Sequence, residues 1–307
     1  MQLETFFVKS FNIMKHKTLN CNGKLVCIDS PMVMGIVNIT PDSFYDGGSY
    51  TTEVKLLNRC EAIIAEGGGV IDIGAVSTRP GAQNVDATEE MRRLDWALSL
   101  VRKHFPEKII SVDTYRADIA KAAVENFEVD IINDISAGTL DDRMFEIVAA
   151  LNVPYILTHI SGTPENMQEN PVYDNVMENI IGYFSDAVHR LRSIGVKDII
   201  IDPGFGFGKT IEHNYEILSC LKKFEIFELP ILVGVSRKSM IYRLLEIDVQ
   251  DALNGTTVAN TLALMGGADI LRVHDVKEAT QCVKIVQMLR NFSKSETSSL
   301  RIFRPVC

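Results

Sequence analysis

Amide and carboxylate side chains occur in this 307-residue chain at points where short apolar runs end. Asn38 ends the first run, and a set of three, Asp113, Asn133 and Asp202, ends later runs. Their oxygens accept hydrogen bonds, and one carboxylate can accept two parallel N–H bonds from a planar group. This set therefore indicates a site for a neutral, donor-rich edge such as a guanidine-like amide.

Cationic side chains form a second set at similar points. The stretch "STRPGAQ" supplies Ser77, Thr78 and Arg79 on a Pro-Gly turn, and "SRKS" and "RVHD" add Arg237, Lys238, Arg272 and His274. The planar fork of arginine donors suits phosphate oxygens. A few such groups are enough to bind one phosphate group of a small anionic substrate.

Short apolar runs recur along the chain, and each is followed by a longer amphipathic stretch. The runs begin at Val33, Val70, Ile109, Asp130, Pro154, Asp198, Pro230 and Asp269. They are continuous rather than alternating, which is typical of strands buried on both faces. Eight β–α repeats predict an α/β fold, a (β/α)8 TIM barrel, and a doubly wound open sheet is the alternative.

A barrel of this kind places its active site at the carboxyl ends of its strands. In chain order these ends carry Asn38, Asp72, Asp113, Asn133 with Asp134, His159, Asp202, Ser236 with Arg237 and Lys238, and Arg272 with His274 and Asp275. Helix capping explains one such residue well, but it does not explain polar residues at eight strand ends. The loops after strands seven and eight, which hold several of the cations, often bind phosphate in this fold.

Several of these residues have structural interpretations that we weigh above a ligand role. Asp72 can pair at the rim, and His159 can support neighbouring residues without touching a ligand. Asn133 and Asp134 are adjacent on one strand, so only one of them should face the pocket. Asp275 can cap the last helix.

The segment "DPGFGFGKT" resembles the end of a phosphate-binding P-loop at residues 208–210. The first glycine of that motif would fall on Pro203, and the segment follows the sixth strand, so we reject this interpretation. The glycines instead allow the backbone to approach a ligand closely, beside Phe205 and Phe207.

Composition excludes several classes of protein. The formal net charge is −9, which argues against a broad nucleic-acid-binding surface. No apolar stretch of about 18 residues exists, so no membrane span is expected. The 6 cysteines form no CxxC pair, which disfavours a disulfide framework or a zinc site. We expect a cytoplasmic protein.

We divide the chain into three parts. Residues 1–31 form an N-terminal extension with a short hairpin, which turns at Asn22-Gly23 and plugs the barrel bottom. Residues 32–291 form the barrel domain. Residues 292–307 form a tail without clear periodicity, which we expect to be partly disordered.

Seven segments together resemble the signatures of the dihydropteroate synthase family, in the same order and with comparable spacing, from about Met32 to Val276. They are "MGIVNITPDSFYDGG", "STRPGA", "SVDTYRADIA", "IINDISAG", "DPGFGFGKT", "VSRKSMI" and "RVHDV". The resemblance implies a pterin-binding TIM barrel that joins 7,8-dihydropterin-6-ylmethyl pyrophosphate to p-aminobenzoate in folate biosynthesis. It also implies Mg²⁺, a homodimer, and competition by sulfonamides.

The resemblance assigns roles to matching residues. Asn38 would place Mg²⁺ and the pyrophosphate, beneath a lid containing Pro41, Asp42, Ser43 and Phe44. The diphosphate would be held by Arg79, Arg272 and His274. The pterin ring would be bound by Asp113, Asn133, Asp202 and Lys238. The p-aminobenzoate position would be bordered by Pro80, Phe207, Ser236 and Lys238, with Thr78 at its edge. Pyrophosphate would leave first, and the amine would then attack a pterin cation, so no protein nucleophile is needed.

The chain departs from the family pattern in two places. Ala75 and Val76 stand where the family commonly has Gly and Glu, and Thr158 stands where it commonly has Met. Two alternative functions share the fold: a methyltetrahydrofolate-binding methyltransferase barrel and a non-catalytic pterin-binding homologue. The diphosphate-binding residues, which neither alternative needs, are present.

Overall fold

A computed structural model of the chain describes residues 17–39, 50–76, 85–162, 167 and 171–299. Eight parallel strands form one sheet in the order β8-β7-β6-β5-β4-β3-β10-β9. These strands are β3 (Met32–Asn38), β4 (Val70–Gly74), β5 (Ile109–Asp113), β6 (Ile131–Asp134), β7 (Tyr155–Thr158), β8 (Ile199–Asp202), β9 (Leu232–Val233) and β10 (Ile270–Val273). A parallel bridge between Ile201 and Ile231 joins the two edges, so the sheet curves into a barrel. The predicted (β/α)8 fold is confirmed, and the open sheet is excluded.

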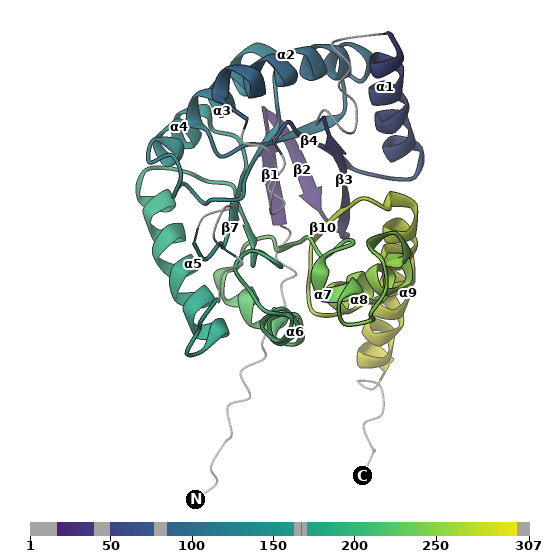
Figure 1. Cartoon of the computed structure of the whole chain (residues 1–307). Coiled ribbons are helices and arrows are strands. Elements are labelled where there is room, and N and C mark those ends of the chain that lie inside the picture. The colour runs from purple at the N-terminus through teal and green to yellow at the C-terminus, as the bar shows by residue number, and fades with distance from the viewer. Residues whose placement is uncertain (1–16, 40–49, 77–84, 163–166, 168–170, 300–307) are drawn as a thin grey trace, which may run out of the picture.

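Helices surround the barrel (Figure 1). They are α1 (Tyr50–Ala65), α2 (Ala87–His104), α3 (Ala117–Phe127), α4 (Met144–Leu151), α5 (Val176–Ser193), α6 (Ile211–Ser219), α7 (Ser239–Tyr242), α8 (Leu253–Met265) and α9 (Val276–Ser299), with 3-10 turns η1 (Leu221–Phe227) and η2 (Val249–Asp251). Their apolar faces pack on the outward side chains of the strands in one large cluster. No helix in the described part is long and apolar enough to cross a lipid bilayer.

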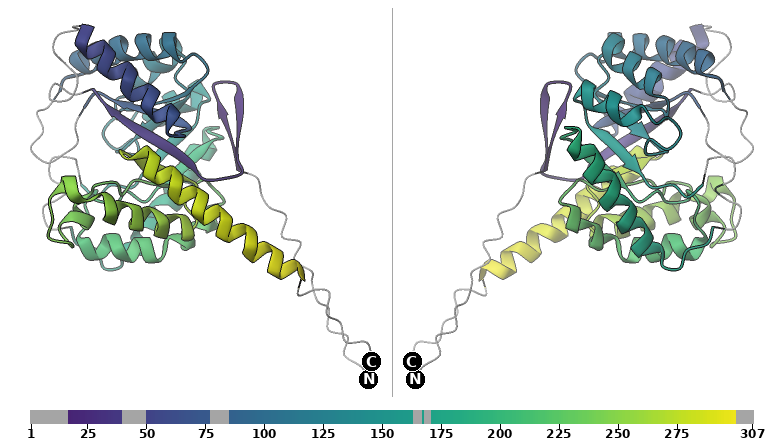
Figure 2. Two further views of the ribbon diagram at one scale, coloured as in Figure 1. Left: turned by 90° about the vertical axis from the view of Figure 1, so that its right-hand side faces the viewer. Right: turned by 90° about the vertical axis from the view of Figure 1, so that its left-hand side faces the viewer.

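A two-stranded antiparallel hairpin, β1 (Lys17–Cys21) and β2 (Lys24–Ile28), lies at one end of the barrel (Figure 2). Asn22 and Gly23 form its turn with φ of 49° and 85°, as the Asn-Gly pair predicts. Leu19 is buried against the lowest layer of side chains inside the barrel, which includes Met34. Each such apolar side chain contributes about 1.5–3 kcal/mol when fully buried. The hairpin therefore plugs the amino-terminal end of the barrel, as predicted.

Helix α9 continues to Ser299, beyond the boundary at residue 291 that we predicted from the sequence. No Gly or Pro interrupts residues 292–299, so nothing in the chain stops the helix there. The helix extends past the barrel in the side views (Figure 2). The rest of the predicted tail, residues 300–307, lies outside the described residues.

Candidate active site

The polar side chains of neighbouring strands meet at the carboxyl end of the barrel. Strand register places Asn38 beside Gly74, Gly74 beside Asp113, and Asp113 beside Asn133. A side chain at Gly74 would lie 3.3 Å from the Asp113 Cβ and 3.5 Å from the Asn38 Oδ1. The missing side chain at this position therefore leaves room for two polar groups.

Arg272 is the centre of a buried charge network on this rim. Its Nε donates to Asp72 Oδ2 at 2.7 Å, and its Nη2 donates to Asp113 Oδ2 at 2.6 Å. The Asn133 amide lies 3.4 Å from both Asp72 oxygens. Asp72 is fully buried and pairs with Arg272, in agreement with the pairing at the rim that we weighed above a ligand role. The network fixes one guanidinium between two carboxylates.

Burial sets the charge states in this network. It raises the pKa of Asp113 to about 7, although the charge of Arg272 opposes the shift. Burial also disfavours the charged form of Arg272, but the charges of Asp72 and Asp113 outweigh it and raise the pKa of Arg272. Arg272 therefore stays a cation, while burial disfavours the ionised form of Asp113.

Lys238 follows β9, the strand paired with β10, and lies between Arg272 and the loop at residues 203–210: a Cβ at Gly234 would be 3.8 Å from the Arg272 Cβ and 3.9 Å from the Lys238 Nζ. Its Nζ donates to the Phe205 carbonyl at 2.5 Å and lies 4.5 Å from the centroid of the Phe207 ring. Burial lowers the pKa of Lys238 to about 8, against the attraction of Asp202. Asp202 accepts the Gly204 N–H at 2.8 Å, and burial raises its pKa.

His274 and Ser236 form a pair beside Arg272. The Ser236 hydroxyl lies 3.1 Å from His274 Nδ1 and accepts the His274 backbone N–H at 3.1 Å. Arg59 donates to the His274 carbonyl at 2.7 Å. These contacts fix the orientation of the imidazole at the end of β10.

Arg237, which the sequence grouped with the rim cations, points away from the site. Its guanidinium pairs with Asp275 at 2.8 Å and 2.9 Å and donates to the carbonyls of Val249 and Gln250. The backbone at Arg237 has φ of 53°, a left-handed conformation that turns its side chain away from the direction of Lys238. Arg237 and Asp275 hold the end of the loop instead of a ligand.

Asp134 and His159 also serve the scaffold. Asp134 accepts hydrogen bonds from Ser136, Gly138 and Tyr155 at 2.7 Å, so of the adjacent pair Asn133 and Asp134, the amide faces the network. Burial lowers the pKa of His159 to about 2, so its ring is neutral. Both residues agree with the structural interpretation.

Two arginines anchor the chain on either side of residues 77–84, which follow β4 and lie outside the described residues. Arg93 donates to the Ala75 carbonyl at 3.1 Å, and Arg116 donates to the Val85 carbonyl at 2.7 Å. Arg116 also pairs with Glu90, which is fully buried. No motif in the sequence indicates these anchors. The predicted site residues Thr78, Arg79 and Pro80, and the predicted lid at residues 41–44, lie outside the described residues.

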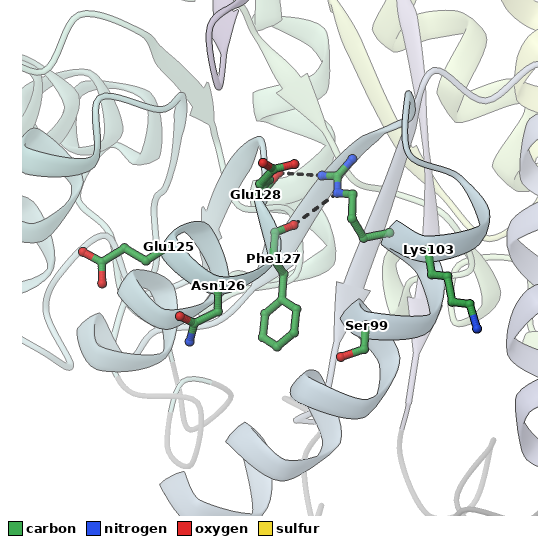
Figure 3. Close-up of a pocket in the computed structure, with 7 residues that line it drawn as sticks. Ser99, Lys103, Glu125, Asn126, Phe127 and Glu128 are labelled. Atoms are coloured by element: carbon green, nitrogen blue, oxygen red, sulfur yellow. Dashed lines mark hydrogen bonds between the residues drawn. The ribbon is translucent and has the colours of Figure 1, made fainter.

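A surface hollow lies between the last turns of α2 and α3 (Figure 3). Both helix ends lead into the amino-terminal ends of strands, so the hollow is on the opposite side of the barrel from the rim. Its one arginine, Arg102, donates to the carbonyls of Phe127, Pro106, Lys108 and Glu128 and to Asp130. Protein acceptors therefore engage every nitrogen of this guanidinium, which leaves none of them for an anion in the hollow.

Comparison with known proteins adds an independent finding. Residues 34–274 match the family described as pterin binding enzyme. The dihydropteroate synthase of Escherichia coli (strain K12) is 38% identical over 271 residues, which cover 88% of this chain and 95% of that protein.

Solved structures agree with the sequence match. The Yersinia pestis dihydropteroate synthase in complex with a sulfonamide drug superposes with a TM-score of 0.83 at 38% identity, covering 89% of this chain and 99% of that one. The Xanthomonas albilineans dihydropteroate synthase with 4-aminobenzoic acid superposes with a TM-score of 0.81 at 33% identity, covering 90% and 98%.

Proposed function

This chain belongs to the dihydropteroate synthase family of pterin-binding enzymes, the transferases of folate biosynthesis, and we propose how its described residues carry out that reaction. The reaction joins 7,8-dihydropterin-6-ylmethyl pyrophosphate to p-aminobenzoate and yields 7,8-dihydropteroate and pyrophosphate. The observation that carries the proposal is the rim itself, where the Arg272 network and Lys238 lie side by side at the ends of neighbouring strands. The carboxylate and amide oxygens of this rim are acceptors for a donor-rich ring, and Arg272 and Lys238 supply cations for a leaving anion.

The pterin ring would bind to the acceptors of β5, β6 and β8. Asp202 is held by the Gly204 N–H, so its carboxylate is oriented before a ligand arrives. A carboxylate accepts two parallel N–H bonds from the amino-pyrimidine edge of a pterin. Asp113 and Asn133 would contact further ring atoms, and the Lys238 ammonium would donate to a ring acceptor.

The diphosphate would lie over Arg272 and His274, with Arg79 as a further predicted contact. Mg²⁺ keeps several waters and usually takes one or two protein oxygens together with substrate phosphates. The Asn38 Oδ1 lies on the rim, 3.5 Å from the position of a Cβ at Gly74, and it is an oxygen of the kind that such a site uses. No cluster of three or more His, Cys, Asp or Glu gathers among the described residues, so the diphosphate itself would supply most of the remaining ligands. The bound ion would stabilise charge on the leaving diphosphate.

The p-aminobenzoate would lie against the Phe207 ring, near Ser236 and Lys238, with Thr78 and Pro80 as predicted neighbours. Sulfonamides would compete for the same position. We propose that pyrophosphate leaves first and that the aromatic amine then attacks the pterin cation. The residues of the rim would orient both substrates and stabilise charge, without forming a covalent bond.

An aspartate exchange tests the pterin assignment. Asp202→Asn should weaken binding of 6-hydroxymethyl-7,8-dihydropterin about 10- to 100-fold, because a charged hydrogen-bond acceptor is lost. Asp134→Asn is the matched control, since Asp134 also ends a strand but faces the scaffold. Calorimetric titration of both folded variants and the wild-type protein gives the affinities. Equal affinity in Asp202→Asn and the wild type would contradict the assignment.

We further propose a homodimer that forms through the α8–α9 face. This face carries Val258, Leu262 and Met265 on α8 and Ile285, Met288, Leu289 and Phe292 on α9, with each side chain at least half exposed. The two helices pack side by side in the barrel wall (Figure 1). Exposed apolar patches of this kind mark interfaces, and a two-fold symmetric pair of copies would cover each patch with the other.

Charge substitutions test the dimer. Leu262→Glu combined with Met288→Glu should convert the protein to a monomer, because two carboxylates per copy would be buried without partners. Leu25→Glu, at an exposed position of the hairpin, is the control and should leave the dimer intact. Sedimentation velocity measures the result. Dimers that persist in the double variant would place the interface elsewhere.

We also propose that the protein acts in the cytoplasm. The described cysteines Cys21, Cys27, Cys60, Cys220 and Cys282 are free thiols. Burial raises the pKa of Cys21 and Cys60 to about 12, so these two are held as unreactive thiols in the core. Free thiols are the usual state in a reducing compartment.

A further inference from the structure

Lys209 is a buried lysine that the roles proposed above do not use. The residue is 4% exposed, and its side chain folds back beneath the loop at residues 203–210 to which it belongs. Its ammonium donates to the Gly204 and Phe207 carbonyls at 2.9 Å each and to the His159 carbonyl at 3.3 Å. It also lies 2.9 Å from His159 Nδ1. The lysine of the rejected P-loop motif therefore binds protein acceptors instead of phosphate.

The loop folds around this ammonium. Gly204, Gly206 and Gly208 have φ of 71°, 81° and 64°, a conformation that turns carbonyl groups inward and that side chains rarely adopt. A side chain at Gly204 would collide with the His159 carbonyl. The Phe207 N–H donates to the Gly204 carbonyl at 3.1 Å and closes the turn.

Two lysines share the carbonyl groups of this loop from opposite sides. Lys209 holds the Gly204 and Phe207 carbonyls from beneath, and Lys238 takes the Phe205 carbonyl from the rim. The Phe207 ring stands over the Lys238 ammonium at 4.5 Å. We propose that Lys209 is a positioning residue that fixes the Phe207 ring against Lys238 and thereby determines the affinity for p-aminobenzoate. The inference rests on the proposed function, since it explains what holds the Phe207 ring in the place where p-aminobenzoate is proposed to bind.

His159 completes the arrangement as an acceptor. Its neutral ring can accept from Lys209 at Nδ1, and the ring packs edge-on against Tyr183 at 5.0 Å. Burial lowers the pKa of Lys209 to about 7, against the attraction of Asp202. The four acceptors stabilise the ammonium in this place, and its loss would take one donor away from each of the carbonyls of His159, Gly204 and Phe207.

Lys209→Met is the direct test. It should raise the KM for p-aminobenzoate about tenfold, because a displacement near 1 Å at a binding surface is enough for such a loss. The KM for the dihydropterin pyrophosphate should change less than about threefold, since the strand residues that bind the ring stay in place. Lys223→Met, at an exposed lysine of η1, is the matched control and should leave both constants unchanged. A purely structural loss of folded enzyme would lower the apparent kcat and move neither KM.

A second pair of variants keeps the inference testable if Lys209→Met does not fold. His159→Asn keeps an acceptor near the position of Nδ1 and should retain the wild-type KM for p-aminobenzoate. His159→Leu removes the acceptor and should raise that KM, by less than Lys209→Met does, while the pterin KM stays constant.

The outcomes separate the two proposals. If the wild-type enzyme is active and Lys209→Met has the same KM for p-aminobenzoate, the role of Lys209 is overturned. If Lys209→Met does not fold, an unchanged KM in His159→Leu overturns it. A wild-type protein that forms no dihydropteroate overturns the proposed function instead.

Discussion

Arg272→Ala is expected to lower kcat/KM about a thousandfold. A preorganised cation at the leaving group should stabilise the transition state at least as much as one oxyanion-hole donor does. The same change should lower the free energy of unfolding by about 3 kcal/mol, because it leaves buried carboxylates without their partner. Asp72 is fully buried and Asp113 is 17% exposed, so neither can be solvated well in its place. Steady-state kinetics and urea unfolding measure the two effects.

A double variant separates the two effects of Arg272. Arg272→Ala with Asp113→Asn removes one of the two unpaired carboxylates and should recover part of the lost stability. It should recover none of the activity, since the cation is still missing. Near-wild-type turnover in either variant would contradict the assignment of Arg272 to the diphosphate.

Lys238→Ala is expected to lower kcat/KM about 100- to 1,000-fold, because it removes a donor that both substrates would contact. The wild-type rate should fall as the pH rises through about 8, where the Lys238 ammonium loses its proton. The variant should lack this decrease. Burial holds the pKa of Lys238 in the folded protein below the ordinary lysine value of 10.5, so the native state binds fewer protons than the unfolded state between these two pH values. The Lys238 contribution should therefore make stability rise with pH across that interval.

Arg237→Ala is the control for Lys238. The two cations are adjacent in sequence, but Arg237 pairs with Asp275 and does not face the rim. Its loss should reduce stability and leave kcat/KM of the folded enzyme and its pH profile near the wild type. A loss of activity in Arg237→Ala equal to that of Lys238→Ala would show that the loop as a whole, and not the Lys238 ammonium, is required.

The barrel could be predicted from the sequence because parallel strands buried on both faces leave a strong signal. The continuous runs that begin at Val70 and Asp198, for example, form strands β4 and β8. The Asn22-Gly23 turn was equally readable, since few residue pairs adopt positive φ at both positions. Alternation along β6 correctly separated Asn133 from Asp134.

Other features depend on long-range contacts that local patterns do not encode. Arg237 and Lys238 have similar charge and neighbouring positions, and only the backbone conformation decides which of them faces the rim. The pairing of Asp72 with Arg272 joins residues 200 positions apart. The burial of Lys209 follows from the fold of a glycine-rich loop, for which the sequence offered only a misleading motif. Thr78, Arg79, Pro80 and the lid at residues 41–44 stay predictions.

Pyrophosphate release by the purified wild-type protein tests the central claim most directly. The assay holds the dihydropterin pyrophosphate fixed and compares reactions with and without Mg²⁺ and p-aminobenzoate. We predict release that requires the metal, with dihydropteroate formed in equal amount. Tight pterin binding without turnover would contradict this result and favour the non-catalytic or methyl-transfer alternative, with Val76 and Thr158 as the first residues to exchange.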